Sequence, residues 1–170
     1  MISSPAAAAP GPYRDVMADV PALTASVTVP SPPHETFSGF TDGFGSWWPA
    51  EFTWSQPTLL ESIAMDCRPG GLLTETGPHG FRIDWGRIQR WDPPAALSFT
   101  WQISADRVPV PDPAQASTVN VSFTAEDGGT TVAVTHDDWD RHGETAATYR
   151  DQFAGAWPMA LDRFQQQLSR

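Results

Sequence analysis

Apolar and polar residues alternate in several short segments of the chain, which is the pattern of β-strands with one buried face. The first segment covers residues 23–29, and the clearest covers residues 97–103, where Leu, Phe, Trp and Ile alternate with Ser, Thr and Gln. Residues 119–123 and 132–136 flank Asp127-Gly128-Gly129, whose glycines supply the positive φ of a hairpin turn. We therefore predict a hairpin that pairs Val119, Val121 and Phe123 with Val132, Val134 and His136.

Further strands are predicted between the first strand and residue 97. Residues 59–67 carry apolar side chains at alternate positions, and residues 72–76 follow a Pro-Gly-Gly turn at residues 68–71. In residues 81–91 one predicted face carries Phe81, Ile83, Trp85, Arg87, Gln89 and Trp91. The pattern indicates an antiparallel sheet of about six strands.

Helical spacing appears on both sides of these strands. Phe37 and Phe40 share one face of a short predicted helix, which Ser31 can cap. Apolar residues then recur at spacings of three and four over residues 144–169, which predicts one long amphipathic helix. Pro158 lies inside this pattern, so we expect a kink there, because proline removes a backbone hydrogen bond.

The composition is that of a folded protein preceded by a tail. Residues 1–20 are rich in Pro and Ala without apolar periodicity, which is typical of a flexible segment, and residues 21–170 are predicted to form a single domain. The chain is 40% hydrophobic and holds eight Trp and nine Phe, enough apolar surface to offset the entropy lost on folding.

Charge and cysteine content exclude several functions. The net charge is -10 and all ten basic residues are Arg, so the chain repels polyanions, and we expect neither nucleic acid nor a membrane as partner. The lack of Lys excludes Schiff-base chemistry and a P-loop. With Cys67 as the single cysteine and no basic residue before the N-terminal alanines, we expect a reducing, cytoplasmic location.

Several short motifs occur in a fixed order over residues 23–168. They are Phe37 with Trp47-Trp48-Pro49, then Arg68-Pro69-Gly70-Gly71, Gly86-Arg87-Ile88, Asp92-Pro93-Pro94 through Trp101, Gly129-Thr130 through His136, and Gly155-Ala156-Trp157 with Leu161. In these motifs the chain resembles the activator of heat-shock-protein-90 ATPase homologue-like family, within the START and birch-pollen-allergen-like (SRPBCC) superfamily.

The resemblance implies an α+β helix-grip fold, in which a curved antiparallel sheet and two short helices wrap around a long C-terminal helix. It also implies a cavity between sheet and helix. Members of the superfamily include lipid and hormone carriers, polyketide cyclases and co-chaperone domains, so the fold alone does not decide the function.

Aromatic residues on the predicted inward faces are the candidates for lining such a cavity. The alternative interpretation is an ordinary packed core, which aromatic stripes usually form. The candidate ligand-binding residues of this kind are Trp48, Trp85, Phe99, Trp101, Phe123, Tyr149, Phe153 and Trp157.

Polar residues on the same faces could orient a ligand. Glu61 and Arg87 fall between apolar neighbours, and the fork of donors on Arg87 suits an anionic ligand. Alternatively, the two side chains pair with each other or lie at the rim of the sheet. His136 is the third polar candidate, and with Glu61 and Arg87 it could move protons in an enzyme.

Two further clusters have a functional and a structural interpretation. His136, Asp137, Asp138 and His142 lack the i, i+4 spacing of a two-His metal site, so we predict no metal and no cofactor, and interpret the segment as a solvated acidic loop. Trp47, Trp48 and Trp54 could form a lip over the cavity, an exposed protein-binding patch or part of the core. Because two adjacent indoles on one helix face cannot both point inward, we expect one near the surface.

Three functions follow from these observations. The first is binding of a small hydrophobic or amphipathic molecule, with a small apolar or aromatic compound as the partner. The second is a polyketide cyclase-like or hydrolase-like enzyme that uses the same cavity, and the third is a co-chaperone-like interaction module. The long helix is committed to its own sheet, so a homodimer would have to use a strand edge or the outer sheet face.

Overall fold

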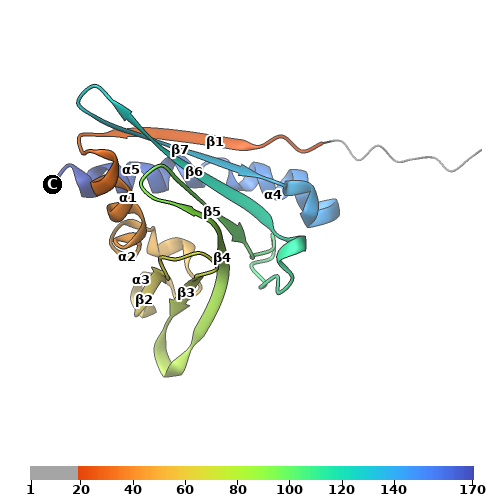
Figure 1. The fold of residues 1–170 in the computed structure, drawn as a ribbon. Coiled ribbons are helices and arrows are strands. Elements are labelled where there is room, and N and C mark those ends of the chain that lie inside the picture. Colours follow the sequence, from red (N-terminus) through yellow and green to blue (C-terminus); the bar gives the residue numbers. More distant parts are fainter. Residues whose placement is uncertain (1–18) are drawn as a thin grey trace, which may run out of the picture.

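The sheet and the helices are described by a computed structural model of residues 19–170, so most of the predicted tail at residues 1–20 lies outside the described residues. Seven antiparallel strands form one sheet in the order β1-β7-β6-β5-β4-β3-β2 (Figure 1). Their bounds are Leu23–Val29 (β1), Ser62–Met65 (β2), Leu72–Thr76 (β3), Arg82–Asp92 (β4), Ala96–Trp101 (β5), Ser117–Glu126 (β6) and Gly129–Asp137 (β7).

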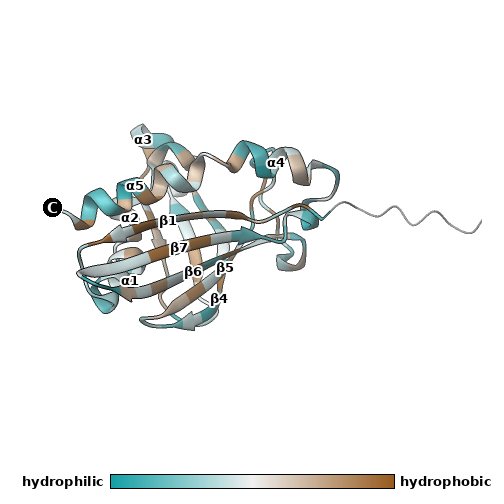
Figure 2. Ribbon diagram, turned by 90° about the horizontal axis from the view of Figure 1, so that it is seen from above, coloured by the Kyte–Doolittle hydropathy of each residue, from teal (hydrophilic) through white to brown (hydrophobic). Residues whose placement is uncertain are grey.

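The α-helices precede β2 or follow β7. Figure 2 shows the two C-terminal helices α4 and α5 along one face of the curved sheet, and α5 packs on β1 and α2. The α-helices are Pro33–Thr41 (α1), Phe44–Trp47 (α2), Gln56–Leu59 (α3), Ala146–Phe153 (α4) and Ala156–Leu168 (α5). Short 3-10 helices cover Ala50–Phe52 (η1), Pro78–Gly80 (η2), Pro113–Gln115 (η3) and Trp139–Thr145 (η4). Among residues 19–170, no helix has the length and apolar character needed to cross a membrane.

The predicted α+β helix-grip architecture is confirmed, with seven strands where about six were expected. The hairpin has the predicted register, in which Val119 faces His136, Val121 faces Val134 and Phe123 faces Val132. The predicted strand at residues 59–67 is shorter, because α3 ends at Leu59 and only residues 62–65 pair with β3.

Strict alternation fails in β4 because the strand is irregular. In its pairing with β3, the register of β4 shifts between Asp84 and Gly86. In its pairing with β5, the register shifts again between Ile88 and Arg90. A bulge of this kind changes which face the following side chains occupy. As a result Trp85, Gly86 and Ile88 are buried, whereas Arg87 is exposed, so the predicted single face from residue 81 to 91 is wrong.

The C-terminal helical segment and the first helix each differ from the prediction at one point. The predicted long helix is divided into α4 and α5 by a turn at residues 154–155, one turn before Pro158. The helix breaks before Pro158 because the ring of a helical proline crowds the carbonyl four residues earlier, here that of Ala154. Pro158 itself lies in the first turn of α5, where proline is tolerated. At α1 the N-cap is Pro32 rather than Ser31.

Candidate functional site

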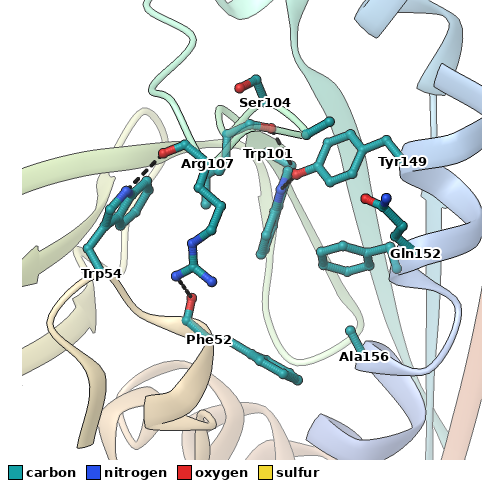
Figure 3. A pocket seen from close by; sticks show the side chains of 11 residues that line it. Phe52, Trp54, Trp101, Ser104, Arg107, Tyr149, Gln152 and Ala156 are labelled. Carbon is teal, nitrogen blue, oxygen red and sulfur yellow. Dashed lines mark hydrogen bonds between the residues drawn. The ribbon is translucent and has the colours of Figure 1, made fainter. Parts of the chain in front are cut away.

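An open pocket lies where β5 ends and where α4 gives way to α5 (Figure 3). It has a volume of about 270 Å³. Its walls come from β5 and the following loop, from α4 and the start of α5, and from the segment around η1. The lining residues are Phe52, Trp54, Trp101, Ile103, Ser104, Ala105, Arg107, Tyr149, Gln152, Phe153 and Ala156.

Most polar groups in the pocket wall bond to one another. The Trp101 indole N–H donates to the Tyr149 hydroxyl oxygen at 2.9 Å, and the Tyr149 O–H donates to the carbonyl of Ile103 at 2.9 Å. Burial raises the pKa of Tyr149 to about 12, although the Trp101 hydrogen bond opposes the shift. Tyr149 is therefore a neutral hydroxyl at physiological pH, and it fixes the positions of two wall residues.

The mouth of the pocket is closed on one side by contacts between two loops. The Trp54 indole donates to the carbonyl of Arg107 at 2.9 Å, and Arg107 Nη2 donates to the carbonyl of Phe52 at 3.4 Å (Figure 3). The same Nη2 also donates to the carbonyl of Thr53 at 2.8 Å. Next to them, an ion pair between Glu51 and Arg163 ties η1 to α5 and lowers the pKa of Glu51. These contacts hold Trp54 and Arg107 at the rim.

Behind the pocket lies a much smaller void of about 10 Å³, room for about one water molecule. Glu75 of β3 faces this void and is fully buried. Its carboxylate accepts the backbone N–H groups of Trp54 at 3.0 Å and Ser55 at 2.7 Å. The void is also lined by Trp85, whose indole nitrogen is buried and has no hydrogen-bond partner within residues 19–170.

A chain of buried hydrogen bonds runs beside the pocket, behind Trp101 and Phe153. The Trp157 indole lies 3.1 Å from His136 Nδ1, the Ser117 hydroxyl lies 2.8 Å from His136 Nε2, and the same hydroxyl lies 3.0 Å from His142 Nε2. An indole N–H can only donate, so Nδ1 of His136 accepts and Nε2 carries the proton. His136 then donates to Ser117, and the Ser117 hydroxyl links His136 to His142.

Both histidines in this chain are held neutral. Burial lowers the pKa of His136 well below its usual value, and the neighbouring His142 adds to the shift. Burial also lowers the pKa of His142. The interpretation of the segment after His136 as a solvated acidic loop is therefore wrong for its histidines, because His136 is fully buried and His142 is half-buried.

The predicted aromatic candidates divide into three groups. Trp101, Tyr149 and Phe153 line the pocket. Trp48 and Trp85 line the small void behind it, together with Trp101. The remaining candidates are buried in the core away from both spaces, and they are Phe99, Phe123, His136 and Trp157.

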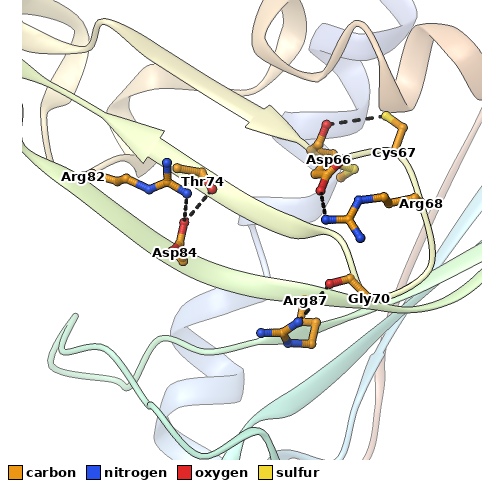
Figure 4. A network of polar contacts seen from close by, with 9 residues as sticks. Asp66, Cys67, Arg68, Gly70, Thr74, Arg82, Asp84 and Arg87 are labelled. Carbon is orange, nitrogen blue, oxygen red and sulfur yellow. Dashed lines mark hydrogen bonds and ion pairs between the residues drawn. The ribbon is translucent and has the colours of Figure 1, made fainter.

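The predicted inward orientation of Glu61 and Arg87 is wrong. Both side chains are exposed and lie outside the pocket. Glu61 precedes the short strand β2, and the bulge in β4 turns Arg87 outward, where Nη1 donates to the carbonyl of Gly70 at 2.9 Å (Figure 4). The two do not pair, since the described residues give Arg87 no carboxylate partner.

The expectation that one of the adjacent indoles lies near the surface is also wrong. Trp47 is 2% exposed and Trp48 is 6% exposed. Trp47 is the last residue of α2, whereas Trp48 has the extended backbone angles φ -59° and ψ 131°, so they do not share one helix face. Trp47 packs on Phe40 and Phe164, and Trp48 packs on Trp85 and Trp157.

Sequence reasoning missed three polar features of this region. Glu75 follows Leu73 at a spacing of two, and this alternation could have indicated its buried position. Arg107 lies in a proline-rich loop that has no periodic pattern. Ser117 and His142 approach His136 only through the fold.

The family follows from comparison of the whole chain with known proteins. Residues 30–169 match the family described as activator of Hsp90 ATPase homolog 1-like protein. The chain belongs to this family. No curated protein matches it.

Solved structures similar to this Hsp90 ATPase activator homolog-like protein include two at more than a quarter identity. One is the anthrahydroquino-γ-pyrone synthase Txn09 complexed with SUM, at 31% identity and a TM-score of 0.61, with 87% of this chain and 97% of that chain covered. The other is the self-sacrificing resistance protein CalC from Micromonospora echinospora, at 27% identity and a TM-score of 0.60, with coverage of 88% and 95%. Protein NE0264 from Nitrosomonas europaea shares the fold at 16% identity, with a TM-score of 0.58 and coverage of 87% and 94%.

The pocket of this family member is suited to binding and orienting a ligand. Of the eleven residues that line it, only Arg107 and Tyr149 have titratable side chains. The described lining holds no Asp, Glu or His, the side chains that most often act as general bases. What the pocket offers is flat aromatic surface, a fixed shape and one cation at the rim.

Proposed function

We propose that this protein binds a small aromatic molecule in the pocket between β5, α4 and the segment around η1. The observation that carries the proposal is the pocket itself, a space of about 270 Å³ with Trp54, Trp101, Tyr149 and Phe153 among its walls. Ligand pockets typically measure about 300–1,000 Å³ and have mostly apolar walls with a few polar groups. This one is near the lower limit, which favours a compact ligand.

The similarity to Txn09 supports an aromatic ligand. Txn09 is named for a product that contains an anthrahydroquinone, which is a planar aromatic system. It is 31% identical to this chain, and the match covers 87% of this chain. Aromatic rings stack favourably on flat or edge-presenting indole and phenyl groups. The walls of the pocket present both kinds of group.

Filling the pocket tests the proposal. Ala156 lines the pocket at the first residue of α5, whereas Ala147 is an exposed residue of α4 outside it. In Ala156→Phe the new ring occupies the binding space, so the affinity for the neutral probe 2-naphthamide should fall at least tenfold. Ala147→Phe is the matched control and should bind like the unsubstituted protein.

Titration of tryptophan fluorescence measures both affinities, because Trp54 and Trp101 lie in the pocket wall. Equal affinities for Ala156→Phe and Ala147→Phe would place the ligand elsewhere. Failure of the unsubstituted protein to bind 2-naphthamide and a set of anthraquinone derivatives would remove the proposal.

A second candidate function is a cyclisation reaction on an aromatic substrate, and the observation that favours it is the synthase name of Txn09. The pocket could contribute by holding a flexible chain in a reactive conformation, which can account for about 7–11 kcal/mol of a barrier. Incubation with an anthrahydroquinone that carries an open-chain precursor of the γ-pyrone ring, followed by liquid chromatography of the product, tests it. Conversion no faster than without protein would leave binding as the function.

The co-chaperone alternative rested on an exposed apolar patch at three tryptophans. Trp47 and Trp48 are buried, and the Trp54 indole is engaged with the carbonyl of Arg107. These residues therefore give no support to an interaction module at this surface.

A further inference from the structure

The pocket contains one cation that the fold does not neutralise. Of the nine arginines within residues 19–170, six form ion pairs with carboxylates. Arg107 is not among these six, and its Nη2 donates only to the carbonyl oxygens of Thr53 and Phe52. The Nε and Nη1 groups of Arg107 have no partner among the described residues.

The described lining of the pocket contains no carboxylate that would neutralise the charge of Arg107. Among residues 19–170, no Asp or Glu lines the pocket, although the whole chain carries a net charge of -10. The Arg107 side chain is exposed at the open mouth of the pocket, beside the aromatic side chains of Trp54 and Phe52, so a ligand can reach its guanidinium group from solvent. An anionic group that enters the pocket would therefore meet an attractive positive charge at this rim.

Other hydrogen-bond donors of the wall are already engaged. The Trp101 indole donates to Tyr149, the Tyr149 hydroxyl donates to Ile103, and the Trp54 indole donates to the Arg107 carbonyl. Among the side chains that line the pocket, this leaves Arg107 with the neutral groups of Gln152 and Ser104 as donors for a ligand. Only Arg107 of these three can form a charge-assisted pair with an oxygen anion.

The backbone places this side chain at a conformational cost. Arg107 has φ 59°, a left-handed conformation that costs a non-glycine residue about 1–2 kcal/mol. The loop tolerates it because the N–H of Arg107 bonds to the carbonyl of Ser104 and the Ser104 hydroxyl accepts the N–H of Val108. Strained residues of this kind are concentrated at functional sites.

We propose that the ligand of this pocket carries an ionised oxygen, a carboxylate or a phenolate, and that Arg107 binds this oxygen at the pocket mouth. The inference rests on the proposed function, since it names the class of aromatic molecule that the pocket accepts. The sequence suggested Arg87 as the residue that binds an anion, and the structure favours Arg107 instead because Arg107 lines the pocket.

Two isosteric probes test the inference at pH 7.5, where 2-naphthoate is charged and 2-naphthamide is neutral. The unsubstituted protein should bind 2-naphthoate at least tenfold more tightly than 2-naphthamide. Arg107→Met should lose this preference, with 2-naphthoate weakened more than tenfold and 2-naphthamide changed less than threefold. Arg107→Lys should retain part of the preference, because it keeps the charge without the planar fork.

Arg87→Met is the matched control, since Arg87 also lacks a carboxylate partner but lies outside the pocket. It should keep the full preference for 2-naphthoate. Equal affinity of the unsubstituted protein for both probes would overturn the inference while leaving the proposed function intact. An equal loss for both probes in Arg107→Met would assign Arg107 a purely structural role. If neither probe bound to the unsubstituted protein, the inference would fail, and the proposed function would fail with it unless an anthraquinone derivative bound.

Discussion

The aromatic core is closed at one end and open at the other. Under α1 and α2, the rings of Phe40, Trp47 and Phe164 lie with centroids 4.7–5.3 Å apart, and each residue is at most 2% exposed. Toward α4, Trp101 and Phe153 make the same kind of contact at 5.0 Å, but both also face the pocket.

The difference between the two ends follows from the regularity of the chain. At the closed end α5 and the long strands β6 and β7 continue without interruption. At the open end β5 stops at Trp101, a loop replaces the next strand residues, and the C-terminal helical segment breaks at residues 154–155. Where regular elements end, the layers separate, and the same aromatic composition lines a pocket instead of filling a core.

The largest expected difference between the two ends is in stability. Phe164→Ala removes a fully buried ring and should lower the free energy of unfolding by about 3–5 kcal/mol. Phe153→Ala removes a half-buried ring whose space is continuous with the pocket, so its cost should stay below about 2 kcal/mol. Urea unfolding curves measure both values, and equal costs would show that the pocket end is packed as tightly as the closed end.

The histidine chain predicts a pH dependence that belongs to the open end. At pH values well above about 6.5, the ordinary pKa of histidine, both histidines are neutral in the folded and the unfolded state, so they contribute no pH dependence. Below that value the unfolded chain takes up protons that folded His136 and His142 resist, because their pKa values are lowered by burial. Stability therefore falls as the pH drops, by up to about 1.4 kcal/mol per pH unit for the buried His136, with a smaller contribution of the same sign from the half-buried His142.

The variant His136→Gln isolates this effect. It disrupts buried hydrogen bonds and should cost about 1–3 kcal/mol at pH 7.5, yet the loss of stability between pH 7 and 5 should become smaller than in the unsubstituted protein. His34→Gln is the control, because His34 is exposed, and should leave the pH dependence unchanged. An unaltered pH slope in His136→Gln would show that the histidine chain does not control acid stability.

A smaller effect is expected at the wall between pocket and void. In Glu75→Gln only one side-chain oxygen can accept a hydrogen bond, whereas both oxygens of the carboxylate accept one. The backbone N–H of either Trp54 or Ser55 therefore loses its partner. The expected cost is about 1–2 kcal/mol, with a weaker affinity for 2-naphthamide as Trp54 loses its fixed position. Glu61→Gln, at an exposed carboxylate, should change neither quantity. An unchanged affinity in Glu75→Gln would mean that Trp54 is held by its Arg107 contact alone.

The closed end of the molecule could be predicted from the sequence far better than the open end. The hairpin register followed from alternation and from its glycine turn, and Phe37 and Phe40 marked the face of α1 that is buried. These features depend on contacts between residues close in the chain or on a regular period. Such local signals are strongest where the elements are regular.

The open end depends on irregular features that no period reveals. A bulge in β4 turned Arg87 outward, and a proline-rich loop brought Arg107 to the pocket in its place. The break at residues 154–155 exposes Ala156 to the pocket, whereas the sequence indicated a kink at Pro158. Each of these depends on long-range packing, so the pocket lining could be predicted only in part.

The smallest expected effect is that of Trp85→Phe, which we compare with Trp47→Phe at the closed end. Trp47 and Trp85 are each 2% exposed, but the Trp47 indole donates to the carbonyl of Phe40 at 3.1 Å, whereas the Trp85 indole has no partner within residues 19–170. Trp47→Phe should lose packing and leave that carbonyl without its donor, at a cost of about 2–3 kcal/mol. In Trp85→Phe the lost packing is offset by removal of a buried unpaired N–H, so the change should stay within about 1 kcal/mol. Equal losses in thermal or urea unfolding would show that the Trp85 N–H has a hydrogen-bond partner in solution, such as a water molecule in the adjoining void.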